Sequence, residues 1–222
     1  MRTEATNRRL PELRPVRRLA AISLVAAIAA GLLAPSAPAS PAAKPRVTII
    51  GDSVMASFDY VPAARRTLGR GLDLRSDTAV CRRLVAASCP FQGIAPPTAL
   101  DVIRTSARTL GSVVVINVGY NDWSAVYDVG RVVRELREAG VKRIVWVTLR
   151  EAGVHAALYA QSNARIRAAA RRWTDVVVAD WNARSQGRSW FRGDGLHLTS
   201  AGALALAQLL RPLALAGAGS ST

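Results

Sequence analysis

The strongest constraint on the fold is a series of short apolar runs separated by longer segments of helical character. Nearly continuous apolar runs of this length indicate strands that are buried on both faces of a sheet. The expected strands are 46–51, 72–76, 112–118, 143–148 and 175–179. The expected helices are 53–68, 97–110, 124–139, 156–173 and a last helix from Thr199 to Leu210, stopped by Pro212. This alternation predicts an α/β fold, a three-layer α/β/α sandwich around a five-stranded parallel sheet.

The N-terminal region has the pattern of an export signal. Residues 1–18 contain six Arg and two Glu, and the apolar run 19–34 and an Ala-x-Ala ending at Ala39 follow. We expect a signal peptide over 1–39 with cleavage after Ala39. An uncleaved anchor is the alternative, although 16 apolar residues are fewer than the roughly 20 that span a bilayer. The remaining expected parts are a linker over 40–45, one domain over 46–215 and a flexible tail over 216–222.

The net charge of +15 comes from 30 Lys and Arg against 15 Asp and Glu. A basic excess of this size is compatible with a nucleic-acid partner. However, 28 of the basic residues are Arg, a usage that GC-rich codon bias also produces, and no recognition motif accompanies them. We therefore expect no nucleic-acid partner, and at most a location near an anionic cell envelope.

Cysteine and histidine are scarce, with only Cys81, Cys89, His155 and His197 in the chain. So few soft ligands cannot build a zinc finger, and no glycine-rich phosphate loop is present, so we expect no metal and no cofactor. In an oxidising compartment, a disulfide between Cys81 and Cys89 is the favoured interpretation. Two unpaired thiols are the alternative, since spacing alone does not show whether the side chains meet.

Polar residues of the acyl-transfer type follow three of the expected strands. Gly51-Asp52-Ser53 follows the first, Gly119-Tyr120-Asn121-Asp122 the third, and Asp194-Gly195-Leu196-His197 the fifth. Parallel sheets carry their sites in the loops beyond the carboxyl ends of their strands. We expect Ser53 to be the nucleophile, His197 its base and Asp194 the group that orients His197. The Ser53 N–H, placed at a helix start, and the Asn121 side-chain amide are the expected oxyanion donors.

These three motifs, in this order, resemble those of the SGNH (GDSL-like) hydrolases, over residues 46–210. The resemblance implies a flavodoxin-like fold and a serine, aspartate and histidine triad at Ser53, Asp194 and His197. The family's second block supplies a glycine N–H as an oxyanion donor, but 78–83 contains no glycine. The alignment places Cys81 there, with Gly93 as the competing donor.

The expected function is a secreted or envelope-associated serine esterase that hydrolyses acetyl or longer acyl esters through an acyl-serine intermediate. The substrate would be a small ester or an acylated glycan or lipid, and the mature enzyme a monomer without stable membrane insertion. Two alternatives stay open: an acyltransferase acting on envelope glycans or lipids, and a non-catalytic module that binds the envelope.

Overall fold

The computed structural model describes residues 43–122 and 126–218. The chain divides into two units, Met1–Pro41 and Ala42–Thr222, and every element below belongs to the second. The predicted signal peptide, its cleavage site, the first half of the linker and the last four residues lie outside the described residues.

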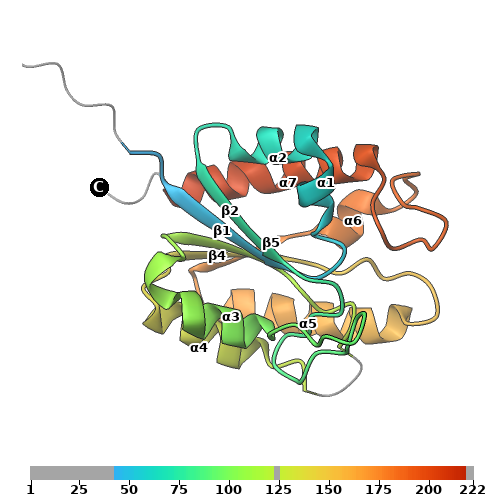
Figure 1. Cartoon of the computed structure of the whole chain (residues 1–222), viewed down its shortest axis with the longest axis horizontal. Helices are drawn as coiled ribbons and strands as arrows, with labels where there is room; N and C mark the ends of the chain where they lie inside the picture. The colour runs from blue at the N-terminus through green and yellow to red at the C-terminus, as the bar shows by residue number, and fades with distance from the viewer. Residues whose placement is uncertain (1–42, 123–125, 219–222) are drawn as a thin grey trace, which may run out of the picture. The chain divides into compact units, whose positions relative to one another are not determined.

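One parallel sheet organises the described unit (Figure 1). Its strand order is β2-β1-β3-β4-β5, with every neighbouring pair parallel. In this order β2 is added on one side of β1, and β3, β4 and β5 are added in turn on the other side. It is the flavodoxin-like order that the resemblance implies. The strands are β1 (Arg46–Gly51), β2 (Asp73–Thr78), β3 (Val113–Asn117), β4 (Arg143–Val147) and β5 (Val176–Ala179).

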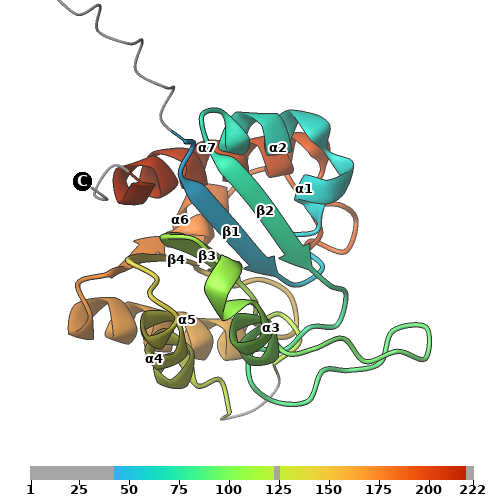
Figure 2. The ribbon, with the colours of Figure 1, turned by 60° about the vertical axis from the view of Figure 1, so that its left-hand side comes forward.

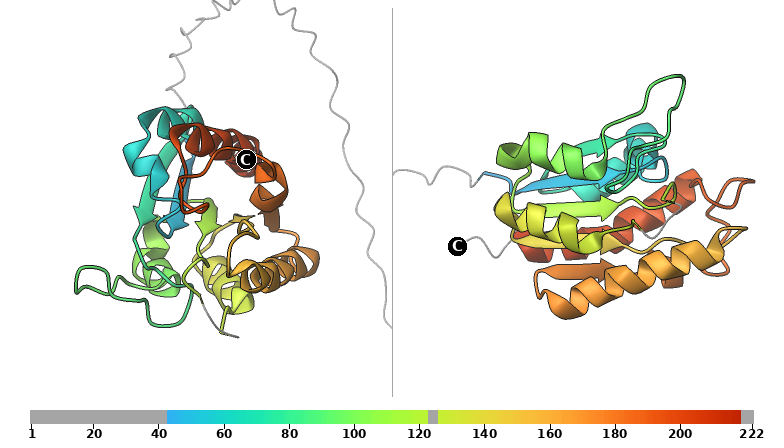
Figure 3. Two further views of the ribbon diagram at one scale, coloured as in Figure 1. Left: turned by 90° about the vertical axis from the view of Figure 1, so that its right-hand side faces the viewer. Right: turned by 90° about the horizontal axis from the view of Figure 1, so that it is seen from below.

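Helices cover both faces of the sheet and complete the predicted three layers (Figures 1 and 3). One face carries α1 (Ser57–Tyr60), α2 (Pro62–Gly69), α6 (Trp181–Ser185) and α7 (Ser200–Ala218). The other face carries α3 (Ala99–Ser106), α4 (Val129–Glu138) and α5 (Ala156–Arg172), with a short 3-10 turn at Ala107–Thr109. The α/β/α sandwich is therefore confirmed.

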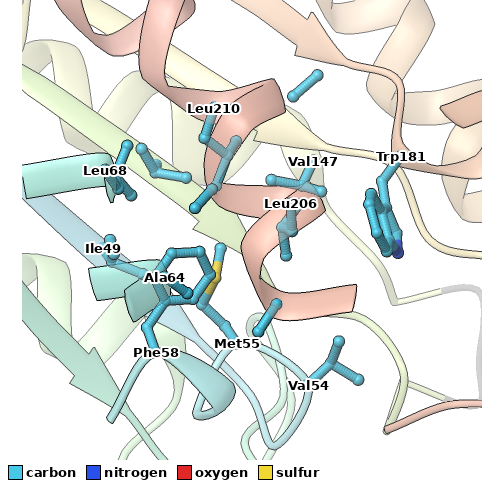
Figure 4. Packing of buried hydrophobic residues seen from close by; sticks show 14 of the residues in the cluster. Ile49, Val54, Met55, Phe58, Ala64, Leu68, Val147, Trp181, Leu206 and Leu210 are labelled. Carbon is cyan, nitrogen blue, oxygen red and sulfur yellow. The ribbon is translucent and has the colours of Figure 1, made fainter. Parts of the chain in front are cut away.

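Two apolar cores lie on opposite sides of the sheet because successive side chains of a strand point to opposite faces. In β1, Ile49 packs toward α2 and α7, whereas Ile50 packs toward α3 and α4. The first core is completed by Met55, Phe58 and Leu206 (Figure 4).

The expected helix over 53–68 is wrong as a single element. Residues 53–56 form a turn, and two short helices, α1 and α2, follow it, the second opened by Pro62. The proline ring fixes its own φ and clashes with helical geometry in the preceding residue, so the helix restarts at this position.

The last helix runs to Ala218 instead of ending before Pro212. An internal proline costs a helix about 3 kcal/mol. The part of α7 beyond Pro212 still buries Ala214 in the core, and the Arg211 guanidinium donates to the carbonyl groups of Leu68 and Arg70. These contacts outweigh the cost, and the expected tail begins inside the helix. By length and composition α7 could cross a membrane, but its apolar stripe packs against α2 and the sheet.

Candidate active site

Asp52 holds the first loop of the site against the loop that follows β3. Its carboxylate accepts hydrogen bonds from the backbone N–H groups of Val54 at 3.1 Å, Gly119 at 3.2 Å and Tyr120 at 3.2 Å. Complete burial raises the pKa of Asp52 to about 7, although the three N–H donors oppose the shift. Asp52 therefore fixes the backbone around Ser53, and both of its carboxylate oxygens accept backbone N–H groups.

The structure brings Ser53, His197 and Asp194 into one hydrogen-bonded row. His197 Nε2 lies 3.0 Å from Ser53 Oγ, and His197 Nδ1 lies 2.7 Å from Asp194 Oδ2. The carboxylate fixes a proton on Nδ1, which leaves Nε2 as an acceptor for the serine proton. Ser53 and His197 are 144 residues apart in the chain, so this arrangement depends on the whole fold.

A hairpin between α6 and α7 carries both Asp194 and His197. The Arg192 N–H donates to the His197 carbonyl at 2.8 Å, and Phe191 and Leu198 form an isolated antiparallel bridge. At the tip, Gly195 has a φ of 68°, in the left-handed region that favours glycine. This turn lets one oxygen of Asp194 accept the N–H groups of Leu196 and His197 while the other faces the imidazole.

The carboxylate of Asp194 is held in its charged form. Partial burial opposes ionisation, but the N–H of Leu196 and the ring and N–H of His197 outweigh it and lower the pKa of Asp194 to about 2. Arg150 also holds the hairpin in place by contacts at two of its residues. Its guanidinium donates to the Gly195 carbonyl and lies 3.9 Å from the centre of the Phe191 ring.

Two backbone donors are available where an oxyanion hole is expected. Within the part of the chain that the structure describes, neither the Ser53 N–H nor the Cys81 N–H has a backbone or side-chain acceptor. Cys81 has a φ of 66°, a conformation that suits glycine, and it is the residue that the sequence alignment set opposite the glycine donor. The predicted disulfide is present and ties Cys81 to Cys89.

The other expected donors are placed differently. The Asn121 side-chain amide donates one proton to the Arg82 carbonyl at 3.2 Å, which leaves its second N–H for another acceptor. Gly93 lies in the exposed turn between Phe91 and Ile94, at the tip of a hairpin. Ser53 is in the turn before the four-residue α1, so the expected support from a helix dipole is wrong.

Arg82 supports the candidate site in a way that the sequence does not show. Its guanidinium is buried and donates to the carbonyl groups of Gly51, Asp77 and Pro97. It thereby joins the ends of β1 and β2 to the start of α3. The only signal was an Arg-Arg pair beside Cys81, which an Arg-rich chain also produces by chance.

Asp122 and Asn163 also support the loops of the site. Asp122 accepts the Leu84 N–H, and burial raises its pKa to about 6, opposed by that bond. Asn163, in α5, bonds both the N–H and the carbonyl of Leu149 at 2.7 Å. In residues 43–122 and 126–218 no group of three or more Asp, Glu, His or Cys side chains is placed to hold a metal ion.

No family model matches the chain, and no curated protein does. Solved structures do. A carbohydrate acetylesterase family member from Sinorhizobium meliloti has a TM-score of 0.60 at 16% identity, over 79% of this chain and 99% of its own. The structure of TesA has a TM-score of 0.57 at 16% identity, over 75% of this chain and 96% of its own. A family 3 carbohydrate esterase from Clostridium thermocellum has a TM-score of 0.51 at 15% identity, over 79% of this chain and 99% of its own. At these identities the similarity concerns the fold alone, and residues 43–218 have an SGNH-like hydrolase fold.

Proposed function

We propose that this protein is an exported serine esterase that hydrolyses carboxylic esters through an acyl-serine intermediate. The observation that carries the proposal is the row Ser53 Oγ, His197 Nε2 and Nδ1, and Asp194 Oδ2, with separations of 3.0 and 2.7 Å. The shared fold with structures named as esterases supports it. A disulfide beside the site supports export, because such bonds persist in oxidising compartments.

In the first half of the reaction, Ser53 Oγ attacks the ester carbonyl carbon and its proton moves to His197 Nε2. The carbonyl oxygen becomes an oxyanion, for which the N–H groups of Ser53 and Cys81 and the second N–H of the Asn121 amide are the donors. The bond to the alcohol oxygen then breaks. His197 gives its proton to that oxygen, and the alcohol leaves an acyl-Ser53.

Water completes the cycle. His197 Nε2 takes a proton from water, whose oxygen attacks the acyl carbon, and the bond to Ser53 Oγ breaks as the proton returns to it. Asp194 stays ionised throughout and stabilises the imidazolium that forms twice in each turnover. If an alcohol takes the place of water in this step, the same groups transfer the acyl chain, which is the acyltransferase alternative.

Covalent labelling tests the proposal directly. A fluorophosphonate should add once to the wild-type protein, and peptide mass spectrometry should place the adduct on Ser53. Ser53→Ala and His197→Ala should lose the label and the hydrolysis of aryl acetates. His155→Ala, which removes the other histidine, is the matched control and should keep both. Hydrolysis that survives Ser53→Ala would refute the serine mechanism.

A product assay separates hydrolysis from transfer. With a glycan or glycerol acceptor present, the hydrolase releases free acid, whereas a transferase yields a new ester. An intact fold without any label or turnover would favour the non-catalytic binding module.

A further inference from the structure

The loop that carries Cys81 continues into a rigid hairpin with an apolar tip. The Phe91 N–H donates to the Ile94 carbonyl at 2.9 Å, and the Ile94 N–H donates to the Phe91 carbonyl at 3.1 Å. Between them Gln92 and Gly93 have φ values of 51° and 80°, as a type I′ turn requires. The Cys81–Cys89 disulfide restrains the chain two residues before this hairpin begins. The tip is therefore built to hold one shape.

The tip exposes large apolar side chains to solvent, whereas turns at a protein surface are usually polar. Phe91 is 47% exposed and Ile94 is 73% exposed, and the segment stands out from the body of the domain (Figures 2 and 3). Residues 85–97 contain no Asp, Glu, Lys or Arg, in a chain of which 20% is charged. An uncharged tip can enter an apolar phase without the cost of desolvating a charge.

Other exposed apolar side chains lie on the same edge of the sheet. Among the described residues, the strongly exposed large apolar side chains fall, with the exception of Leu215, on segments that follow the carboxyl ends of β1 to β4. Val154, on the loop after β4, is 95% exposed. These side chains are Tyr60, Val80, Phe91, Ile94, Val126 and Val154. The edge that contains Ser53 is thus the edge with the apolar tips.

The charge of the domain adds a second, long-range attraction. From residue 40 onward the chain contains 24 basic and 13 acidic residues. A positive excess draws a protein toward an anionic lipid surface, and protruding apolar side chains then anchor it there. Separate apolar tips suit a soft lipid phase better than the closely matched face of a protein partner.

We propose that the Phe91–Ile94 hairpin inserts into an anionic lipid surface and seats the catalytic edge on it, so that Ser53 takes its ester from lipid molecules in that surface. This substrate class rests on the esterase function proposed above. The docking itself does not depend on catalysis and is tested separately.

Vesicle binding tests the docking. The full-length sequence, N-terminal segment included, is expressed in a host that exports the protein. The purified protein is then sedimented with vesicles that contain equal amounts of phosphatidylcholine and phosphatidylglycerol. The double variant Phe91→Ser/Ile94→Ser should bind at least tenfold more weakly than wild type. Leu215→Ser removes an exposed apolar side chain from α7, far from the tips, and should bind as wild type does. Any contribution of the N-terminal segment is common to all three proteins.

The outcomes are distinct. Equal binding of the double variant and wild type, or no binding by wild type, overturns the docking. Binding that is as strong to pure phosphatidylcholine, or unchanged in 0.5 M salt, overturns the electrostatic part.

Activity completes the test. The double variant should hydrolyse a soluble aryl acetate within twofold of wild type but lose most turnover of a vesicle-borne ester. Loss of both activities would mean that the tip shapes the active site itself. If Ser53→Ala remains active while the binding results hold, the esterase mechanism fails and the docking stands.

Discussion

The start of α7 leaves no room for a side chain at Gly202. A β-carbon there would lie 3.0 Å from Trp190 Cβ and 3.1 Å from its carbonyl carbon, and it would overlap the carbonyl oxygen. Non-bonded carbon and oxygen atoms keep about 3.3 Å or more, so helix and hairpin would have to separate by about 1 Å. The same Trp190 carbonyl accepts the Thr199 N–H at 2.9 Å and the Thr199 hydroxyl at 3.1 Å. Gly202→Ala therefore displaces the segment that carries Asp194 and His197.

A misplacement of about 1 Å in a catalytic group costs about 100-fold in rate. We expect Gly202→Ala to lower kcat/KM for a soluble aryl acetate by about this factor. The thermal unfolding temperature should change little. Alanine favours a helix over glycine by up to about 1 kcal/mol, and this gain offsets part of the cost of the clash.

Gly130→Ala in the first turn of α4 is the matched control. A β-carbon there meets its neighbours at 3.4 to 3.5 Å, an ordinary contact, so this variant should keep full activity and unfold at an equal or higher temperature. Activity of Gly202→Ala within threefold of wild type would show that α7 and the hairpin move together and would refute the packing argument.

Asp194→Asn should lower kcat by about 10⁴-fold in steady-state assays, because an amide no longer fixes the histidine tautomer, and a loss below tenfold would contradict this role. The pKa of Asp52, raised by burial to about 7, means that the folded protein keeps a proton that the unfolded chain releases near the ordinary pKa of 3.8. The free energy of unfolding should therefore fall, by at most about 4 kcal/mol, as pH rises from about 4 to 7. Urea midpoints across this range should fall for wild type and fall less in Asp52→Asn, in which the raised pKa of Asp122 still contributes, and a flat wild-type curve would contradict the burial argument. Replacing Cys81 and Cys89 by serine opens a loop of eight residues and should cost about 2.5 kcal/mol in urea unfolding, whereas an unchanged midpoint would show that the loop is restrained by other contacts.

The central strands were predictable because their side chains are buried on both faces of the sheet, and such strands are continuous apolar runs in the sequence. Val113 to Asn117 is buried throughout, as a continuous apolar run requires, and the strand order follows from the fold that the motifs imply. The length of α7 was not predictable. Beside Pro212, Arg211 donates to carbonyl groups near the end of α2, which lie 141 to 144 residues away along the chain. Contacts at such a separation cannot be read from the local sequence.

The candidate site divides in the same way. Ser53, Asp194 and His197 stand out because their residue types are informative and histidine is rare. The residues that position them do not stand out. Arg82 and Arg150 are hidden among 28 arginines, and two of the three amides that Asp52 binds lie 67 and 68 residues away. Such roles depend on contacts that only the folded chain creates.

The direction of α7 also decides where the described domain ends. The helix starts beside the hairpin that carries Asp194 and His197 and runs back along the sheet, so that Gly217 packs against Arg143, the first residue of β4. At the other terminus, Pro45 accepts the N–H of Asp73, the first residue of β2. Both ends thus leave at the amino edge, opposite Ser53. A tether at either end, to a bead or a sensor chip, would present the catalytic edge to the solution, which is the orientation needed to watch single vesicles land on it.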